Sequence, residues 1–280
     1  MLEGVPGLAK TLLIHSVAKA LDLKFSRIQF TPDLMPADIT GTEIIQENKT
    51  SGKREFQFYK GPIFSNIVLA DEINRTPPKT QAALLQAMQE KNVTIGNKTY
   101  DLEKPFFVFA TQNPIEQEGT YPLPEAQLDR FMFNLIITYP NNQEEINIVK
   151  NIHNIMNANI NPILNSQQLI KFQKLIINMP VSDYVIEFAV NFVRSTRINN
   201  NTLDKIKNWL DWGAGPRASA MLIIAAKAHA LINGRTTPDI DDIKKIIKPV
   251  LRHRIIPNFN AEAEGITRDD ILEYLIKKIK

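Results

Sequence analysis

The residues that most constrain the fold of this chain stand at its start, where a glycine-rich loop runs directly into an amphipathic helix. The loop reads Gly4-Val-Pro-Gly-Leu-Ala-Lys-Thr11, which fits the pattern Gly-x-x-x-x-Gly-Lys-Thr except that Ala9 replaces the second glycine. From Leu12 to Leu21 apolar residues recur at helical spacing, so we expect a helix whose positive N-terminal end faces an anion. A glycine-proline turn before an ordinary amphipathic helix is the alternative.

Each residue type in such a loop has a chemical role. Backbone N–H groups curl around a polyphosphate, the Lys10 ammonium reaches the β- and γ-phosphates, and the Thr11 hydroxyl ligates Mg²⁺. The sequence therefore predicts a nucleotide-binding loop that consists of Gly4, Val5, Pro6, Gly7, Leu8, Ala9, Lys10, Thr11 and Leu12.

A second motif follows a continuous apolar run, Ile67-Val-Leu-Ala70, which is typical of a strand buried on both faces of a parallel sheet. The run ends on Asp71 and Glu72, at the strand end where open α/β sheets bind ligands. Asp71 can hold Mg²⁺ and Glu72 can polarise an attacking water. A solvated acidic pair is the alternative, but its combination with the lysine loop favours a nucleotide hydrolase.

Composition excludes several other classes of protein. The chain has 280 residues, 44% hydrophobic and 22% charged, which is typical of a globular protein of about two domains. No apolar run has the length of a membrane span, and the absence of cysteine fits a reducing compartment, so we expect a cytoplasmic protein. The net charge of +3 is too small to indicate nucleic-acid binding. The four histidines lack zinc-ligand spacing.

The first half of the chain alternates strand-like and helix-like segments, which predicts an α/β core with a parallel sheet. Two segments interrupt this alternation and are predicted to form hairpins, one over 43–60 that turns at Ser51-Gly52 and one over 93–100 that turns at Gly96-Asn97. The expected strands are 25–30, 67–70, 106–110 and 135–139, and the expected helices are 12–21 and 79–90.

From Asn141 onward the apolar residues recur only at helical spacing, as in Val185, Phe188, Phe192 and Val193. A strong helix is expected over 218–233, ended by Gly234. We therefore expect two domains, an ATPase-type core over 1–140 and an all-α domain over 141–280.

Five ordered motifs resemble those of MoxR-type AAA+ ATPases, and the resemblance covers nearly the whole chain. They are Gly4-Val-Pro-Gly-Leu-Ala-Lys-Thr11, Asp71-Glu-Ile-Asn-Arg-Thr-Pro77, Ala110-Thr-Gln-Asn-Pro114, Leu123-Pro-Glu-Ala-Gln-Leu-Asp-Arg-Phe131 and Gly213-Ala-Gly-Pro-Arg-Ala-Ser219. The resemblance implies a P-loop NTPase core, a helical lid, and ATP with Mg²⁺ held by Thr11 and Asp71.

The resemblance also implies roles for further polar residues. Asn113 resembles the sensor that positions the water together with Glu72, with an Asn-Pro turn as the alternative. Arg130 resembles the arginine finger that reaches the neighbouring subunit's γ-phosphate, where a guanidinium neutralises transition-state charge. Arg217 resembles the second sensor arginine, which contacts phosphate from the same chain, with a surface arginine as the alternative. Arg75 is expected to face a subunit interface.

For such a family member the implied assembly is a homo-oligomeric ring, expected to be a hexamer, that uses ATP hydrolysis to remodel protein clients. The implied clients include von Willebrand factor A-domain proteins and enzymes that need metal or cofactor insertion. The two hairpins resemble the helix-2 insert and pre-sensor hairpin of one AAA+ clade; ordinary surface hairpins are the alternative. Two other functions stay open, a nucleic-acid motor and a nucleotide-gated scaffold with little hydrolysis.

One departure from the family concerns the strand that precedes the loop. In the family a helix and a central strand come first, whereas here only Met1, Leu2 and Glu3 precede the loop, which is too short for that strand. Because unpaired backbone groups in a sheet interior are costly, at about 1–3 kcal/mol each, we expect either a truncated start or a damaged nucleotide site. The adenine pocket is affected by the same departure.

Overall fold

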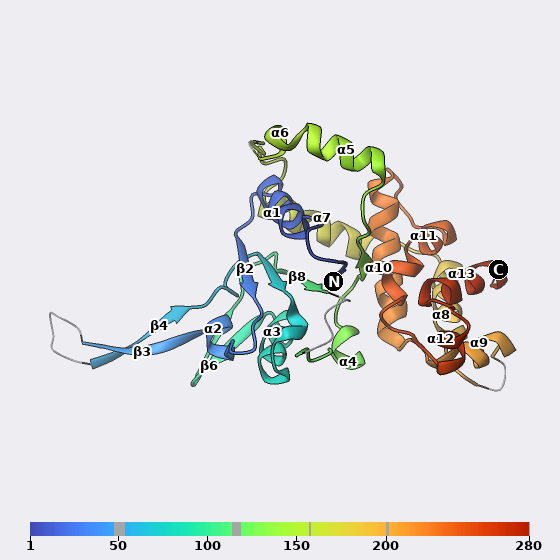
Figure 1. Cartoon of the computed structure of the whole chain (residues 1–280), viewed down its shortest axis with the longest axis horizontal. Coiled ribbons are helices and arrows are strands. Elements are labelled where there is room, and N and C mark those ends of the chain that lie inside the picture. The colour runs from blue at the N-terminus through green and yellow to red at the C-terminus, as the bar shows by residue number, and fades with distance from the viewer. Residues whose placement is uncertain (48–53, 114–118, 157, 200–201, 280) are drawn as a thin grey trace. The chain divides into compact units, whose positions relative to one another are not determined.

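The computed structural model describes residues 1–47, 54–113, 119–156, 158–199 and 202–279. The chain forms two units (Figure 1). The first, the sheet unit, comprises residues 1–123 and 136–170, and the second, the helical unit, comprises 124–135 and 171–280.

The sheet unit is built on five strands in the order β2-β5-β8-β1-β9. Their bounds are β1 Leu2–Glu3, β2 Phe25–Gln29, β5 Ile67–Asp71, β8 Phe107–Gln112 and β9 Leu135–Ile136. The pairs β2–β5, β5–β8 and β1–β8 are parallel. All of β5 is buried, as its unbroken apolar run predicts for a strand covered on both faces. The predicted parallel α/β core is confirmed.

The place of the central strand is occupied by only two residues, Leu2 and Glu3. They pair with Thr111 and Gln112 of β8, whereas Phe107–Ala110 of β8 pair with β5. We expected the residues before the loop to be too short for this strand, and the two residues that form β1 pair with β8. Leu2 is buried in the apolar core between α1 and the sheet.

Helices cover the sheet, and α1 continues directly from the glycine-rich loop. The helices of this unit are α1 Lys10–Ala20, α2 Pro36–Thr40, the 3-10 turn η1 Ile73–Arg75, α3 Pro78–Glu90, α5 Asn142–Lys150, α6 Ile152–Met156 and the start of α7 Ser166–Asn178. Ile14 and Ala18 of α1 pack on Ile67 and Leu69 of β5. This contact sets the loop above the carboxyl ends of the strands.

Both predicted hairpins are present, β3 (Gly41–Glu47) with β4 (Arg54–Lys60) and β6 (Asn92–Ile95) with β7 (Lys98–Asp101). The first extends away from the sheet (Figure 1), and its predicted turn at Ser51-Gly52 lies outside the described residues. The second turns at Gly96, whose φ of +56° favours glycine. Phe58 of the first hairpin stacks on Tyr100 of the second, with ring centroids 4.4 Å apart.

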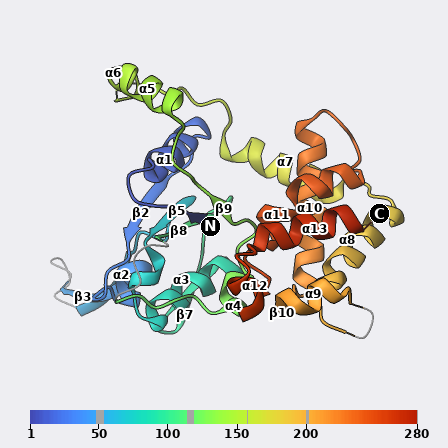
Figure 2. The same cartoon turned by 45° about the vertical axis from the view of Figure 1, so that its right-hand side comes forward.

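The helical unit is all-α apart from a short two-stranded sheet (Figure 2). Its elements are α4 Glu125–Leu128, the end of α7, α8 Asp183–Ser195, α9 Asp204–Trp209, β10 Leu210–Trp212, α10 Pro216–Ile232, α11 Ile240–Leu251, β11 Ile256–Pro257, α12 Phe259–Ala263 and α13 Arg268–Lys278. Helix α10 packs against α8 and α11, and buried Phe192, Leu222 and Ile247 belong to one core. The predicted helix ended by Gly234 is confirmed as α10.

The chain passes between the two units three times, after residues 123, 135 and 170, whereas we expected a single boundary near residue 140. Residues 124–135 belong to the helical unit, and 136–170 return to the sheet unit. The reason lies in buried polar contacts, because Arg254 and His253 hold the backbone carbonyl of Phe131.

None of the helices in the described residues is by itself long and apolar enough to cross a membrane. Helices α7 and α8 pass such a test together by length and composition, but they are bent by 91°.

Candidate nucleotide site

The glycine-rich loop takes a conformation that only some residues tolerate. A Cβ on Gly4 would lie 2.5 Å from the Ile137 carbonyl oxygen, so the close approach of these two segments requires glycine. Gly7 has a φ of +86° in the left-handed region. Ala9, at the N-cap of α1, also has a left-handed φ of +53°, which is strained for a residue with a Cβ. The second glycine of the general pattern therefore has a structural role that Ala9 fulfils with strain.

Lys10 begins α1, and its side chain turns back over the loop. The Nζ donates to the carbonyl oxygens of Gly4 at 2.6 Å and Val5 at 2.8 Å. Burial lowers the pKa of Lys10, while the nearby carboxylates of Asp71 and Glu72 oppose this shift. An ammonium has three donors, and these two hydrogen bonds use two of them.

The acidic pair is organised by Thr111, at the end of the neighbouring strand β8. Its hydroxyl donates to Asp71 Oδ1 at 2.5 Å and accepts from the Glu72 backbone N–H at 2.8 Å. One hydroxyl thus fixes both the carboxylate of Asp71 and the backbone of Glu72, whose φ of +56° ends the strand abruptly.

Two further side chains come from β2, on the other side of β5. Arg27 donates to Asp71 Oδ2, and Gln29 Nε2 donates to Glu72 Oε2 at 3.0 Å. Arg75 also donates to Glu72 Oε2, at 3.1 Å. The sequence predicted that Arg75 faces a subunit interface, and this prediction stays untested. Thr111 belongs to one of the motifs that the sequence analysis identified. The contact between Arg27 and Asp71 could not be predicted from the sequence, because it depends on which strands are neighbours.

These groups surround one cavity of about 370 Å³. It is lined by Pro6, Gly7, Leu8, Ala9, Lys10, Thr11, Arg27, Asp71, Glu72, Thr111, Gln112 and Asn113. Asn113 follows β8 and is buried. Gly4 and Val5 instead border a second, mainly apolar cavity with Ile136, Ile137, Thr138 and Tyr139, and Leu12 is exposed. The structure therefore brings together most of the residues predicted for phosphate, metal and water.

The donor set in the first cavity fits Mg²⁺ bound together with a nucleotide. Mg²⁺ is usually held by one or two carboxylates and by substrate phosphates, with water completing the shell. Asp71 and the Thr11 hydroxyl supply ligands of this type. Within the described residues no cluster of three His, Asp or Glu side chains that could hold a metal ion is present.

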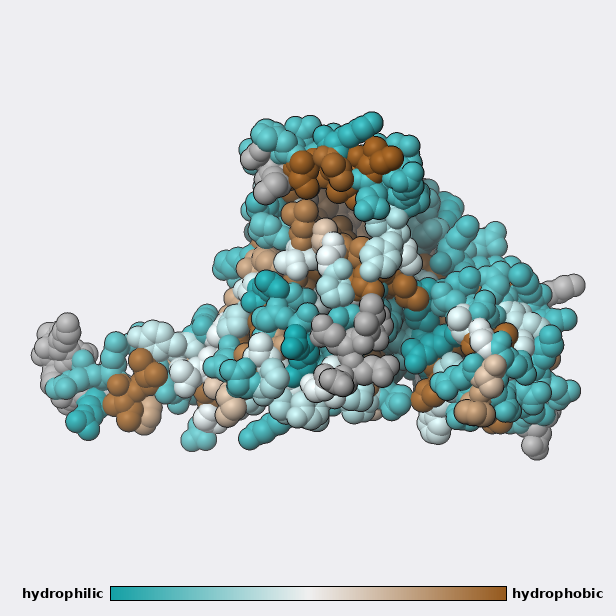
Figure 3. Space-filling model, in the orientation of Figure 1, coloured by the Kyte–Doolittle hydropathy of each residue, from teal (hydrophilic) through white to brown (hydrophobic). Residues whose placement is uncertain are grey.

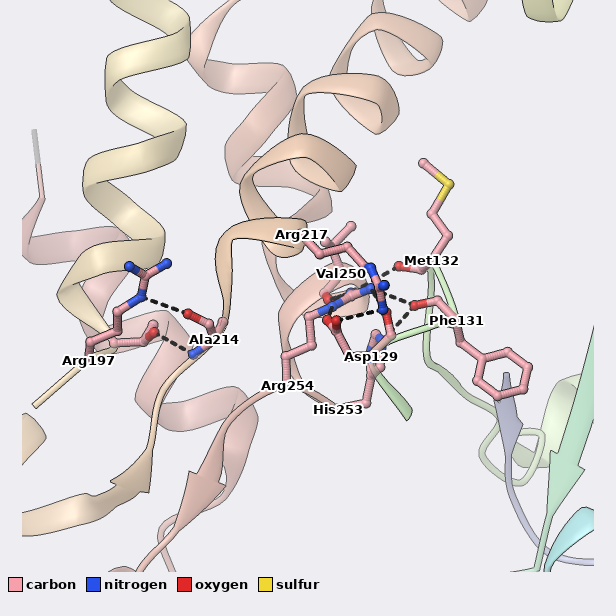
Figure 4. A network of polar contacts seen from close by, with 10 residues as sticks. Asp129, Phe131, Met132, Arg197, Ala214, Arg217, Val250, His253 and Arg254 are labelled. Carbon is pink, nitrogen blue, oxygen red and sulfur yellow. Dashed lines mark hydrogen bonds and ion pairs between the residues drawn. The ribbon is translucent and has the colours of Figure 1, made fainter. Parts of the chain in front are cut away.

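Arg130 and Arg217 both belong to the helical unit. Asp129 contacts Arg217 and Arg254 (Figure 4). Arg217 Nη1 donates to Asp129 Oδ2 at 3.0 Å. Arg254, which sequence analysis missed, donates from Nε to Asp129 Oδ1 at 2.7 Å, and its side chain is 1% exposed. Arg130 directly follows Asp129 and is half-buried. No motif marks Arg254, so only the structure reveals it.

Comparison with known proteins agrees with this geometry. Residues 1–133 match the family described as ATPase family associated with various cellular activities (AAA), and residues 206–275 match the AAA lid domain. The chain is 41% identical over 280 residues to Chaperone MoxR1 of Mycobacterium tuberculosis, which aligns with the whole chain and over 73% of its own length. It is 42% identical over 283 residues to the YeaC protein of Bacillus subtilis, covering 84% of that protein.

A crystal structure of a protein from Cytophaga hutchinsonii has the same fold. Its TM-score is 0.90 at 45% identity, and the match covers this whole chain and 84% of that one. The ordered motifs, the parallel sheet with a helical unit and these relatives agree, and the chain therefore belongs to the MoxR family of AAA+ ATPases.

Proposed function

We propose that this chain binds ATP with Mg²⁺ at the loop before α1 and hydrolyses it with Glu72 as the general base. The observation that carries the proposal is the shared cavity, in which Lys10, Thr11, Asp71, Glu72 and Asn113 line one space. A lysine, a hydroxyl and a carboxylate bind phosphate and metal, and a second carboxylate with an amide can position water.

In this proposal each residue has a separate task. The backbone N–H groups of the loop and Lys10 hold the β- and γ-phosphates. Thr11 and Asp71 hold the metal, which supplies positive charge to the phosphate oxygens. Glu72 accepts a proton from water; its contacts with Gln29 and Arg75 keep the carboxylate oriented until then. Asn113 positions the same water.

We further propose that the chain acts as a ring, most simply a hexamer, in which Arg130 completes the site of the neighbouring subunit. Ring assembly is general among AAA+ proteins, and a guanidinium supplied in trans stabilises charge on a transferring phosphoryl group. Arg217 is proposed to contact phosphate and so to report the nucleotide state to the helical unit.

The work done by hydrolysis is proposed to be the remodelling of protein clients in the cytoplasm, including clients that contain von Willebrand factor A domains or receive a metal or cofactor. The relative from Mycobacterium tuberculosis is named a chaperone. The β3–β4 hairpin exposes apolar side chains (Figure 3), with Ile45 60% exposed and Phe56 72% exposed. These two residues lie directly opposite each other in the hairpin, and such a pair suits contact with an unfolded protein segment.

The Glu72→Gln variant tests the hydrolysis proposal. It removes the base but keeps the shape of the side chain, so Mg·ATP still binds while phosphate release slows by about two to four orders of magnitude. Binding is measured by calorimetry and turnover by phosphate release. Glu103→Gln is the matched control, since Glu103 is an exposed carboxylate paired with Lys24. Near-normal turnover of Glu72→Gln would reject the assignment.

A further inference from the structure

We propose that Asp129 is a positioning residue that links Arg217 to the segment carrying Arg130. It anchors this segment through the buried Arg254, and it holds Arg217 in an ion pair that a bound phosphate must break. This inference rests on the proposed phosphate contacts of Arg217 and Arg130. In it, the Asp129 carboxylate couples the position of one arginine to that of the other.

The first part of the link is a buried clamp on residues 129–132 (Figure 4). Besides the Asp129 carboxylate, Arg254 donates to the backbone carbonyls of Asp129 at 3.0 Å, Phe131 at 2.6 Å and Met132 at 3.3 Å. Removal of the buried guanidinium from the Asp129 carboxylate would leave an uncompensated charge. Arg254 therefore cannot release Asp129 while the unit stays folded.

The second part of the link is exposed and can open. Arg217 pairs with the other oxygen of the same carboxylate, and its side chain is 42% exposed. Exposed ion pairs are weak, whereas a guanidinium binds phosphate through strong charge-assisted hydrogen bonds. A phosphate can therefore take Arg217 from Asp129, although it cannot displace Arg254.

Because only the contact with Arg217 can open, phosphate binding by Arg217 changes how firmly the segment with Arg130 is held. In the structure, Asp129 is tethered on both oxygens, and Arg130 is the next residue along the chain. Once Arg217 moves to phosphate, Asp129 keeps only Arg254, and the segment that carries Arg130 gains freedom. The nucleotide state of one subunit thereby alters the arginine it offers to its neighbour.

A double-mutant cycle with the non-hydrolysable analogue AMP-PNP tests the link in the full chain. We expect Arg217→Gln to weaken binding at least about tenfold, the loss of a charged hydrogen bond. Asp129→Asn should strengthen binding about two- to fivefold, since Arg217 no longer has to leave an ion pair. In the Arg217→Gln background, Asp129→Asn should have no effect. Lys207→Gln, at another exposed ion pair of the same unit, is the control.

The outcomes separate this inference from the proposed function. An equal effect of Asp129→Asn in both backgrounds would mean that Asp129 is only structural. If Arg217→Gln leaves affinity unchanged, Arg217 does not contact phosphate and the inference falls with that role, while Lys10→Ala and Glu72→Gln still test ATP binding and hydrolysis independently.

If Asp129→Asn does not fold, hydrogen exchange of the Arg130 and Phe131 amides replaces it. Both amides donate to backbone carbonyls, so they exchange measurably slowly. In the unmodified chain, saturating AMP-PNP should speed their exchange; in Arg217→Gln the exchange should already be fast and should not change. The same nucleotide response in both proteins would overturn the proposal.

Discussion

Arg27 holds the carboxylate of Asp71 through two donors, Nε at 2.9 Å and Nη2 at 2.6 Å, both on the same oxygen. The other oxygen accepts from the Thr111 hydroxyl. The proposed metal carboxylate is thus partnered on both oxygens by the neighbouring strands β2 and β8. A metal bound here must share Asp71 with the positive charge of Arg27.

Replacement of Arg27 should therefore strengthen metal binding. We expect Arg27→Gln to raise the affinity for Mn²⁺ in the presence of ADP by about two- to tenfold, because a half-exposed competing cation is removed. Electron paramagnetic resonance of free Mn²⁺ measures this directly. Asp71→Asn should lower the same affinity, and Arg27→Lys should lie closer to the unmodified chain. Unchanged affinity in Arg27→Gln would show that Arg27 does not compete.

Lys10→Ala should abolish ATP binding while the chain stays folded. The reason is that Lys10 is the lysine of the loop, and its Nζ donates to the loop carbonyls of Gly4 and Val5. Calorimetric titration with ATP measures the loss, and circular dichroism checks the fold. Lys19→Ala, in the last turn of the same helix, is the control and should bind normally. ATP affinity equal to that of the unmodified chain would exclude the role of Lys10.

Ala9→Gly should stabilise the protein, contrary to the usual effect of glycine at a helix. Because Ala9 has a left-handed backbone, glycine removes strain and should raise the free energy of unfolding by about 0.5–1 kcal/mol. The control is Ala82→Gly on the exposed side of α3, which should lower it by about 0.5–1 kcal/mol. Urea unfolding measures both, and a loss of stability in Ala9→Gly would contradict the strain.

Arg130 should act on the site of a neighbouring subunit. Arg130→Ala and Lys10→Ala are each expected to be inactive, but a mixture should regain part of the ATPase activity, because each chain supplies what the other lacks. Phosphate release is measured after mixing, and mass spectrometry verifies mixed assemblies. Confirmed mixed rings with no activity above that of the separate variants would argue against shared sites.

His253 should make stability depend on pH in mildly acidic solution. Burial and the adjacent Arg254 lower the pKa of His253 to about 3, from an ordinary value of 6.5. Its Nε2 donates to the Phe131 carbonyl at 2.9 Å. Because the pKa is lowered to about 3, the ring stays neutral in the folded state above that pH. The unfolded chain binds the extra proton below pH 6.5, and stability therefore falls as pH drops from 6.5 towards 3, by up to about 1.4 kcal/mol per pH unit.

A His253→Gln variant keeps a donor for Phe131 but no longer titrates, so this slope should disappear. Urea unfolding at several pH values between 3 and 7 measures it. His153→Gln, at an exposed position of α6, should keep the slope. A His253→Gln protein with the slope unchanged would assign the pH dependence to other groups.

Local sequence predicted the loop, the buried strand that ends on Asp71 and the strand before Asn113 well, because each rests on short-range patterns. The apolar run before Asp71 is short and unbroken, as is typical of a strand buried on both faces, and the glycines before Lys10 permit the loop that precedes a helix. The predicted strand at 135–139 is longer than the observed one: β9 spans Leu135–Ile136, and the backbone N–H of Ile137 still donates to the Glu3 carbonyl at 2.7 Å. Strand length depends on the partner, here the two-residue β1.

The sequence alone thus determined which chemical groups exist and the order in which they follow buried strands. The tertiary structure decided which groups meet. Arg27 meets Asp71 because β2 lies beside β5, and Arg254 meets Asp129 because the residues after α11 pack on the segment after α4. The first pair is separated by 44 positions in the sequence and the second by 125. Contacts at such separations produce no pattern that a single sequence could reveal. They follow from strand order and from the need to pair a buried charge.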